Sequence, residues 1–221
     1  MSVLSVLYII AYALVLSLIA FDLVMSMDPH WISTLFGAYS FVKAFYIGLG
    51  ALIILSAIVH LSQGEHSELT SSHFHDLGKL FFAFCLAWAD FFYCQFIVIW
   101  YANISEETSY IIKRTMISPW NSLAWTVFIV SFVIPFLILL NRDIKTKPKF
   151  MIVLCSVVIA GIWLEHLLLL GPALSPHVAV LPLSPVDGFI TLGFLGLMAL
   201  SLIFFLRLFP VLVLIGKREV N

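Results

Sequence analysis

Charged residues are scarce in this sequence. Asp, Glu, Lys and Arg together make up 10% of its 221 residues, whereas 62% of the residues are hydrophobic. Soluble domains carry roughly 25% charged residues. Water would solvate so uncharged a surface poorly, so most of this surface must face lipid. The sequence also lacks basic clusters and nucleic-acid-binding motifs, which excludes nucleic acid as an expected partner.

Cysteine is scarce as well. The three cysteines lie inside apolar runs, without CxxC or CxxCH spacing: Cys85, Cys94 and Cys155. The sequence therefore contains no zinc, iron–sulfur or c-type haem motif. Haem b would need facing histidines on different helices, but His60 and His166 fall toward opposite sides of the membrane. We expect this chain to bind no cofactor and no metal of its own.

Long apolar runs, in contrast, are abundant. A helix needs about 20 apolar residues to cross a bilayer. We predict an all-α, polytopic transmembrane bundle of about six helices that forms one domain over residues 1–221. The predicted helices cover residues 3–25, 38–62, 76–103, 120–141, 150–171 and 186–210. The first run has no basic n-region and no cleavage site, so we interpret it as a retained helix.

The connectors between these helices are predicted to be polar or extended. Pro29 and the weakly amphipathic stretch 31–37 suggest a short interfacial segment, with Trp31 at headgroup level. Residues 104–119 are predicted to form a polar loop. Residues 63–75 form another, which contains histidine and acidic residues but no tight metal-binding spacing.

Lysine and arginine near the helix ends predict the orientation of the chain. One side would carry seven of them: Lys79, Arg142, Lys145, Lys147, Lys149, Lys217 and Arg218. The other side would carry only Lys113 and Arg114. This excess predicts that both termini are cytoplasmic and that, in a bacterium, the chain is a multi-pass protein of the inner membrane.

Ionisable residues at membrane depth are candidate functional groups, because they are costly in lipid unless they face protein or a water-filled cavity. Asp90 is the deepest and shares a helical face with Tyr93 and Tyr101. We expect Asp90 to point into the bundle. Glu165 and His166 are adjacent in the outer half of the fifth predicted helix.

A proton path is one hypothesis for these residues, because a protonatable group at such depth suits a proton relay. The path would use these side chains: Asp90, Glu165, His166, His75, Asp76, Tyr93 and Tyr101. The alternative is structural. In that case the Asp90 carboxyl makes one interhelical hydrogen bond, worth about 1 kcal/mol in a membrane.

Lys43 needs a counterion, because it lies near the outer end of the second predicted helix. Asp22 lies near the outer end of the first predicted helix, at a similar depth. We therefore hypothesise a structural ion pair between Asp22 and Lys43. Glu165 is an alternative partner for the same lysine.

Three stretches of the sequence resemble one protein family. They are residues 22–37 (DLVMSMDPHWISTLFG), 75–84 (HDLGKLFFAF) and 95–108 (QFIVIWYANISEET). They resemble the larger NrfD-like, polysulfide-reductase-type membrane subunits of bacterial alternative complex III. The resemblance is greatest to the quinone-binding subunit 2 of quinol:cytochrome c oxidoreductase. Its most specific part is the string IWYAN at 99–103, followed by EET at 106–108.

This resemblance implies a cofactor-free membrane subunit, not itself catalytic, in a complex that oxidises quinol. Its partners would be other membrane subunits, a multihaem cytochrome c subunit and an iron–sulfur subunit. The chain resembles the C-terminal part of the family protein, whereas the quinol pocket of related subunits lies mainly in an N-terminal bundle. Asp90 stands where the family more often has an aromatic residue, and Ser105 where it has proline.

Two other functions remain open from the sequence. The chain is either a structural membrane anchor, which docks peripheral electron-transfer subunits, or a small independent transporter. A transporter would be expected to show paired interrupted helices and an inverted repeat. The sequence shows neither pattern, which favours the respiratory subunit and the anchor over the transporter.

Overall fold

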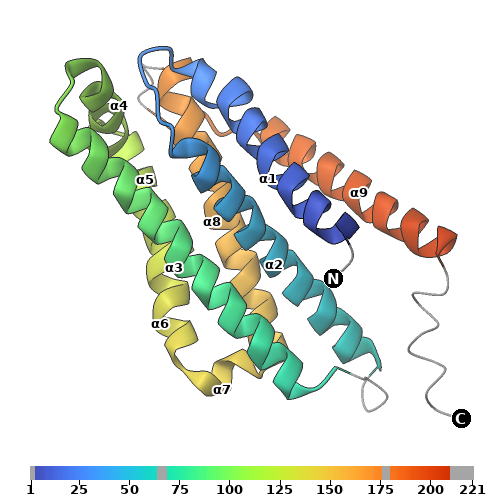
Figure 1. Ribbon diagram of the computed structural model, residues 1–221. Coiled ribbons are helices and arrows are strands. Elements are labelled where there is room, and N and C mark those ends of the chain that lie inside the picture. Colours follow the sequence, from blue (N-terminus) through green and yellow to red (C-terminus); the bar gives the residue numbers. More distant parts are fainter. Residues whose placement is uncertain (1–2, 64–68, 176–179, 210–221) are drawn as a thin grey trace, which may run out of the picture. The chain divides into compact units, whose positions relative to one another are not determined.

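The computed structural model describes residues 3–63, 69–175 and 180–209, and most of these residues are helical, with no β-strand among them (Figure 1). Six of the helices are long and apolar enough to cross a membrane. The predicted all-α fold with six membrane-spanning helices is therefore confirmed, and the chain is a multi-pass membrane protein. It divides into two compact units, Met1–Val180 and Leu181–Asn221. Its description as a single domain stays a prediction.

The first unit contains all helices except the last. In chain order they are α1 (Val3–Leu23), η1 (Met25–Met27), α2 (Phe36–Gln63), α3 (Ser71–Ala102), α4 (Ser105–Thr115), α5 (Trp120–Phe128), η3 (Ile129–Val133), α6 (Ile134–Leu140), α7 (Arg142–Lys145) and α8 (Pro148–Leu174). The second unit contains α9 (Pro185–Leu208), which is apolar around its circumference. Such a helix is suited to surroundings of lipid or of other spans.

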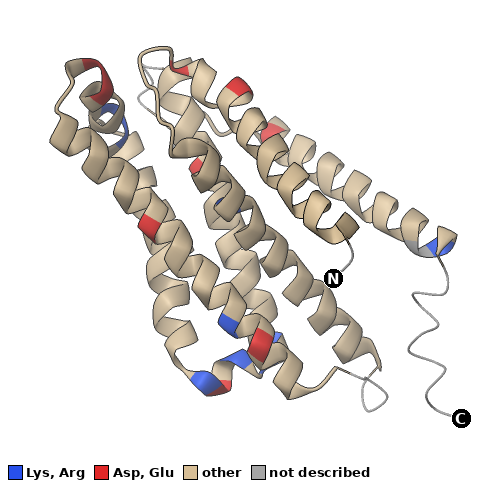
Figure 2. Ribbon diagram, in the orientation of Figure 1, with Lys and Arg blue, Asp and Glu red and all other residues tan. Residues whose placement is uncertain are grey.

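Helix α2 is central to the first unit, where it packs against α1, α3 and α8. Helix α8 also packs against α5. The short helices α4 and α7 lie at opposite ends of this unit (Figure 1). Charged residues gather mainly near helix ends, and long stretches of helix between them carry none (Figure 2). Charges within the spans are therefore exceptions that need an explanation.

Helix α3 begins at Ser71 rather than at residue 76 as predicted. The backbone N–H of Thr70 donates to Nδ1 of His73 at 3.1 Å, as in a capping box. The usual box has Glu or Gln at the third helical position. Because His73 takes that position here, the sequence pattern gave no sign of a helix start, and His75 lies inside a helix instead of a loop.

The predicted polar loop at 104–119 contains helix α4, so that prediction is wrong. Glu106 and Glu107 lie in its first turn, and Lys113 and Arg114 in its last turn. Both charge pairs favour a helix through its macrodipole. Hydropathy alone does not reveal α4, because this helix is short and polar.

The fourth span is interrupted by the π-helical segment η3. Pro135 has no backbone N–H, so the carbonyl of Ser131, four residues earlier, lacks its α-helical donor. The hydroxyl of Tyr46 on α2 donates to this carbonyl at 3.2 Å. A neighbouring helix thus satisfies a backbone group that proline leaves free, as the membrane interior requires.

Candidate functional site

Two clusters of buried polar side chains lie in the first unit. The Glu165 cluster consists of Tyr39, Lys43, Trp88 and Glu165. The Arg114 cluster consists of Asp28, Trp31, Tyr110 and Arg114. Side chains of both clusters line one cavity. This region is the candidate functional site.

The Glu165 carboxylate is fully buried on α8 and accepts three hydrogen bonds from neighbouring helices. Oε1 accepts from the Tyr39 hydroxyl and from Nζ of Lys43, the latter at 3.3 Å. Oε2 accepts from the indole N–H of Trp88 on α3, at 3.2 Å. The carboxylate therefore ties α2, α3 and α8 together at one point.

Burial makes this cluster sensitive to change. Lys43 is 5% exposed and Glu165 0% exposed. Desolvation of two such charges offsets much of their attraction, so a buried ion pair adds little net stability. Removing one partner is nevertheless costly, because the other charge stays buried without compensation. The cluster fixes how the three helices meet, and it holds an ionisable group within a membrane span.

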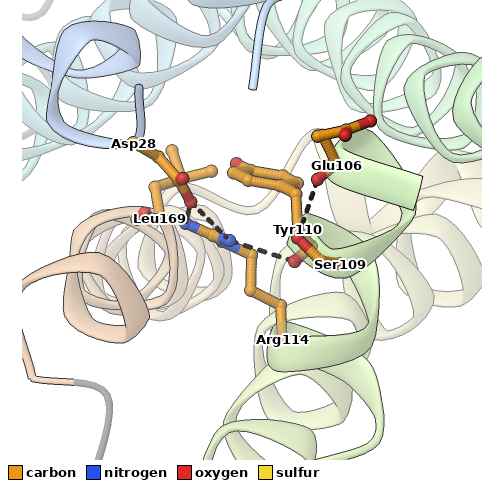
Figure 3. Close-up of polar contacts among 6 residues, drawn as sticks. All are labelled: Asp28, Glu106, Ser109, Tyr110, Arg114 and Leu169. Atoms are coloured by element: carbon orange, nitrogen blue, oxygen red, sulfur yellow. Dashed lines mark hydrogen bonds and ion pairs between the residues drawn. The ribbon is translucent and has the colours of Figure 1, made fainter. Parts of the chain in front are cut away.

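The Arg114 cluster joins α4 to the connector after α1 and to α8 (Figure 3). Nη1 and Nη2 of Arg114 each lie 3.5 Å from Oδ2 of Asp28. Nη1 also donates to the Tyr110 carbonyl at 3.0 Å, and Nη2 to the Leu169 carbonyl at 2.6 Å. Both terminal nitrogens of the guanidinium are thus bound to protein oxygens, namely one carboxylate oxygen and two backbone carbonyls.

Aromatic contacts complete the Arg114 cluster. The guanidinium carbon lies 3.4 Å from the centroid of the Tyr110 ring, a cation–π contact. The same ring stacks on Trp31 with centroids 3.9 Å apart. Trp31 is 2% exposed, so its ring is buried within the protein. Its location at headgroup level stays a prediction. Its amphipathic ring packs against α4, the helix that the sequence analysis missed.

Burial also alters the acid–base behaviour of this cluster. It raises the pKa of the Tyr110 phenol, and the charges of Asp28 and Glu165 raise it further against the opposing effect of Arg114. Burial lowers the pKa of the Arg114 guanidinium, while Tyr110 and Asp28 act in the opposite direction. The Tyr110 hydroxyl therefore keeps its proton at neutral pH and can act as a hydrogen-bond donor.

A cavity of about 90 Å³ lies beside both clusters. Its walls come from α2, α3, α4, α5 and α8, and they are formed by Tyr39, Phe92, Gln95, Phe96, Ile99, Tyr110, Ile111, Arg114, Thr115, Ala124, Leu168 and Leu169. Three polar atoms of these residues are fully buried without a hydrogen-bond partner in the described part of the chain: Nε2 of Gln95, the Tyr110 hydroxyl oxygen and Nε of Arg114.

A larger open groove of about 660 Å³ adjoins this cavity. It runs between the end of α3 and α4 and is lined by Phe96, Ile99, Trp100, Tyr101, Asn103, Thr108, Ile111, Ile112 and Met116. Phe96, Ile99 and Ile111 line both spaces.

Asp90 does not face the bundle, so the expected inward orientation is wrong. The side chain is exposed, and its one hydrogen bond among the described residues, a weak one, comes from the Cys94 thiol 3.9 Å from Oδ1. Trp88 takes the inward position on α3. Asp90 follows it by two residues, which is about 200° around a helix of 3.6 residues per turn.

The other residues of the predicted proton path are also dispersed. Tyr93 is 60% and Tyr101 82% exposed. Asp76 is exposed and pairs with Lys79 at 2.8 Å. Nδ1 of His75 is buried without a partner among the described residues, toward the end of α3 remote from α4. These residues do not form a chain of contacts with Glu165.

His166 follows Glu165 on α8, but its ring is directed toward the preceding turn of its own helix. Its Nδ1 lies 2.9 Å from the carbonyl of Ile162. Lys43 pairs with Glu165 rather than with Asp22, which is exposed. Of the two partners that the sequence left open for Lys43, the structure therefore selects the second.

Sequence reasoning missed most residues of the candidate site. Tyr39, Trp88 and Tyr110 are aromatic residues in aromatic-rich segments, where the pattern does not show which of them is a hydrogen-bond donor. Arg114 was counted as a charge of an exposed loop. A signal was available in the charge pattern of α4, where acidic residues precede basic ones over the length of a short helix.

Among the described residues, no group of three His, Cys, Asp or Glu side chains is placed to hold a metal ion. Glu65, His66 and Glu68 lie outside the described residues. Comparison with known proteins finds no protein family and no curated protein that matches this chain.

Proposed function

We propose that this chain is an integral membrane subunit of a quinol-oxidising respiratory complex of the alternative complex III type. In this proposal the chain holds no haem, iron–sulfur cluster or metal and does not catalyse quinol oxidation by itself. The proposal combines a structural observation, which favours a subunit of a larger assembly, with the sequence resemblance, which suggests the kind of assembly.

The position of Asp90 is the observation that favours a larger assembly. It is exposed near the middle of a membrane-spanning helix, and no described Lys, Arg or His forms an ion pair with it. Ionisable side chains in spanning segments almost always face protein or a water-filled cavity. A partner helix that covers Asp90 and offers a hydrogen-bond donor would meet this requirement.

The most specific part of the resemblance, the IWYAN string, lies at the end of α3. Asn103 ends α3 in the left-handed region, with φ of 49°, and α4 begins at Ser105. Asn is one of the residues that tolerates this conformation. The IWYAN string therefore contains the end of a helix, and four of its five residues line the groove.

The proposal includes partners and a location. The chain would sit in the bacterial inner membrane with both termini in the cytoplasm. It would assemble there with other membrane subunits, a multihaem cytochrome c subunit and an iron–sulfur subunit. A contribution to proton transfer is a subsidiary part of the proposal and now rests on Glu165, since Asp90 faces away from the bundle.

Purification from native membranes through an affinity tag tests the proposal. We expect a complex with a multihaem cytochrome c and an iron–sulfur subunit, and quinol-dependent reduction of cytochrome c. Asp90→Leu should lower the yield of partner subunits several-fold, because it removes the carboxyl that needs a polar neighbour. Asp22→Leu is the matched control, an exposed acidic residue near a helix end, and should leave the yield unchanged.

Recovery of the chain alone, or only with proteins that lack redox groups, would refute the proposal. The double variant Lys43→Met/Glu165→Met addresses the subsidiary proton path, since it replaces a buried ion pair by apolar residues without leaving one charge unpaired. Slower turnover in the assembled complex would support proton transfer through Glu165. Unchanged turnover would instead favour the structural anchor, the second candidate function.

A further inference from the structure

Lys145 is a largely buried cation that has no carboxylate partner among the described residues. It lies in the short helix α7 and is 8% exposed. The ion pairs within the described ranges all join other residues. Its Nζ lies 5.0 Å from the centroid of the Phe82 ring on α3, a cation–π contact. A buried charge is costly unless it is paired, so this ammonium group needs an anion.

An anion can reach this ammonium group from outside the protein. Nζ of Lys145 has no hydrogen bond to a described residue, yet it is not among the unpartnered side-chain atoms that are shut off from the surface. The buried part of Lys145 is therefore its aliphatic stem, and the charged end keeps accessible surface. A lysine in this position is typical of one that covers apolar surface with its stem and presents its charge at the edge.

Close packing against α3 fixes the position of the Lys145 side chain. A Cβ added at Gly78 would lie 3.0 Å from Cβ and 3.1 Å from Cγ of Lys145. The stem therefore rests directly on the backbone of α3 at this glycine, and its ammonium group ends beside Phe82. An exposed lysine has a flexible stem with a mobile charge, whereas this one holds its charge at a defined point.

A second cation, Lys79, lies close to Lys145. Desolvation lowers the pKa of the Lys145 ammonium group, and the charge of Lys79 lowers it further. Lys79 forms an ion pair with Asp76 at 2.8 Å, but both of these side chains are exposed. Exposed ion pairs contribute little free energy. Lys79 is therefore able to turn toward an anion that binds at Lys145, so two ammonium groups can meet one anion.

The end of the first unit around α7 is basic as a whole, and Lys and Arg positions gather there in Figure 2. Among the described residues, this end has five basic and two acidic side chains: Lys79, Arg142, Lys145, Lys147, Lys149, Asp76 and Asp143. The orientation predicted from the sequence places this end at the cytoplasmic leaflet, whose anionic lipids attract basic segments.

The apolar surroundings of the Lys145 ammonium group favour a lipid over a soluble anion. The Phe82 ring stacks on Phe136 of α6, with centroids 5.8 Å apart. Both rings are partly exposed, and both belong to helices that are long and apolar enough to span the membrane. An apolar surface therefore begins beside the ammonium group and continues onto two spans, where acyl chains can pack.

We propose that Lys145 and Lys79 bind the phosphate of an anionic phospholipid, whose acyl chains pack against Phe82 and Phe136. The phosphate supplies the counterion that Lys145 lacks among the described residues. Lysine is a common phosphate-binding residue, because its ammonium group acts as a point charge. The inference is independent of the proposed function, because the ligand comes from the membrane and not from a respiratory partner.

Three substitutions of lysine by methionine separate a defined site from a general attraction of charge. Lys145→Met removes the ammonium group but keeps an unbranched stem against Gly78. Lys79→Met removes the second ammonium group at an exposed position. Lys149→Met is the matched control, because it removes an exposed lysine in the first turn of α8, at the same basic end. All three variants change the net charge of the protein by the same amount.

Native mass spectrometry of the purified full chain in neutral detergent measures the affinity of phosphatidylglycerol and of phosphatidylcholine for each form. We expect the wild type to prefer phosphatidylglycerol, which is anionic, over phosphatidylcholine, which has no net charge. Lys145→Met should weaken phosphatidylglycerol binding about fivefold, the factor that corresponds to the attraction of one basic residue. Lys79→Met should also weaken it, whereas Lys149→Met should leave it nearly unchanged.

Equal binding of the two lipids by the wild type would overturn the inference. Equal losses in all three variants would overturn it too, because they would show a general attraction by net charge. Sodium phosphate is compared with sodium chloride at the same ionic strength. Stronger displacement of phosphatidylglycerol by phosphate would assign the two lysines to a soluble anion and refute the lipid as their ligand. Circular dichroism shows whether each variant is folded, and Lys79→Met tests the site if Lys145→Met is not.

Discussion

The two buried ion pairs among the described residues, Lys43–Glu165 and Asp28–Arg114, differ in how completely their charges are satisfied. Glu165 accepts hydrogen bonds from three side chains on two other helices, and both of its oxygens are used. Arg114 binds Asp28 and two carbonyls, yet its Nε has no partner among the described residues. In the Lys43–Glu165 pair, protein donors alone satisfy both oxygens of the carboxylate. The second pair leaves one buried donor unsatisfied, although the Arg114 residue lines a cavity.

Their positions in the chain also differ. Lys43 and Glu165 belong to two spanning helices, and they are 5% and 0% exposed. Asp28 and Arg114 belong to a connector and to the short helix α4. Disrupting the first pair should therefore destabilise the protein more than weakening the second, and three substitutions measure this difference.

Glu165→Gln should have the largest effect. It leaves the charge of Lys43 buried without a counterion, and breaking a buried pair in this way costs about 3–5 kcal/mol. The measurement is the free energy of unfolding in mixed micelles of mild detergent and SDS. Lys43→Met/Glu165→Met should recover much of the loss. Equal stability of Glu165→Gln and the wild type would show that the pair is not strongly coupled.

Arg114→Lys should have an intermediate effect. Lysine keeps the charge but cannot reproduce the planar fork that reaches Asp28 and two carbonyls at once. Losing a hydrogen bond to a charged group costs about 1.5–3 kcal/mol. The same unfolding assay measures it, with Lys113→Arg as the control on the same helix. A loss greater than that of Glu165→Gln would reverse the ranking of the two pairs.

Tyr46→Phe supplies the uncharged reference and should have the smallest effect. It removes one interhelical hydrogen bond to the Ser131 carbonyl, and such bonds in membranes average about 0.6 kcal/mol. Pro135→Ala supplies a backbone N–H four residues after Ser131. In that background the cost of Tyr46→Phe should fall toward zero. An unchanged cost would mean that proline is not the reason why this carbonyl accepts from Tyr46.

The spanning helices could be predicted because each must contain about 20 apolar residues, and such runs are easily recognised in the sequence. The starts of helices were harder to place. Pro148 marks the first turn of α8, and Ser184 with Pro185 and Asp187 marks the start of α9. The start of α3 has no such familiar signature, because His73 replaces the usual acidic residue of the capping box.

The candidate site could be predicted only in part. Lys43 and Glu165 were found because a charge inside an apolar run always needs a partner. The face on which Asp90 lies was wrongly assigned, because the cost of a carboxyl in lipid favoured an inward orientation, whereas Trp88 takes the buried face of α3. Arg114 was missed because its partners Asp28 and Leu169 are far from it in sequence. Only the folded chain brings them together.

The close approach of α8 to α5 has a consequence for sequence variation. At Gly171 on α8, an added Cβ would overlap the indole ring of Trp120, which is itself 2% exposed and has no room to withdraw. The two positions form a single steric unit, in which any gain in size at one must be matched by a loss at the other. Among homologues of this chain, a residue larger than glycine at position 171 should therefore occur together with a smaller residue at position 120.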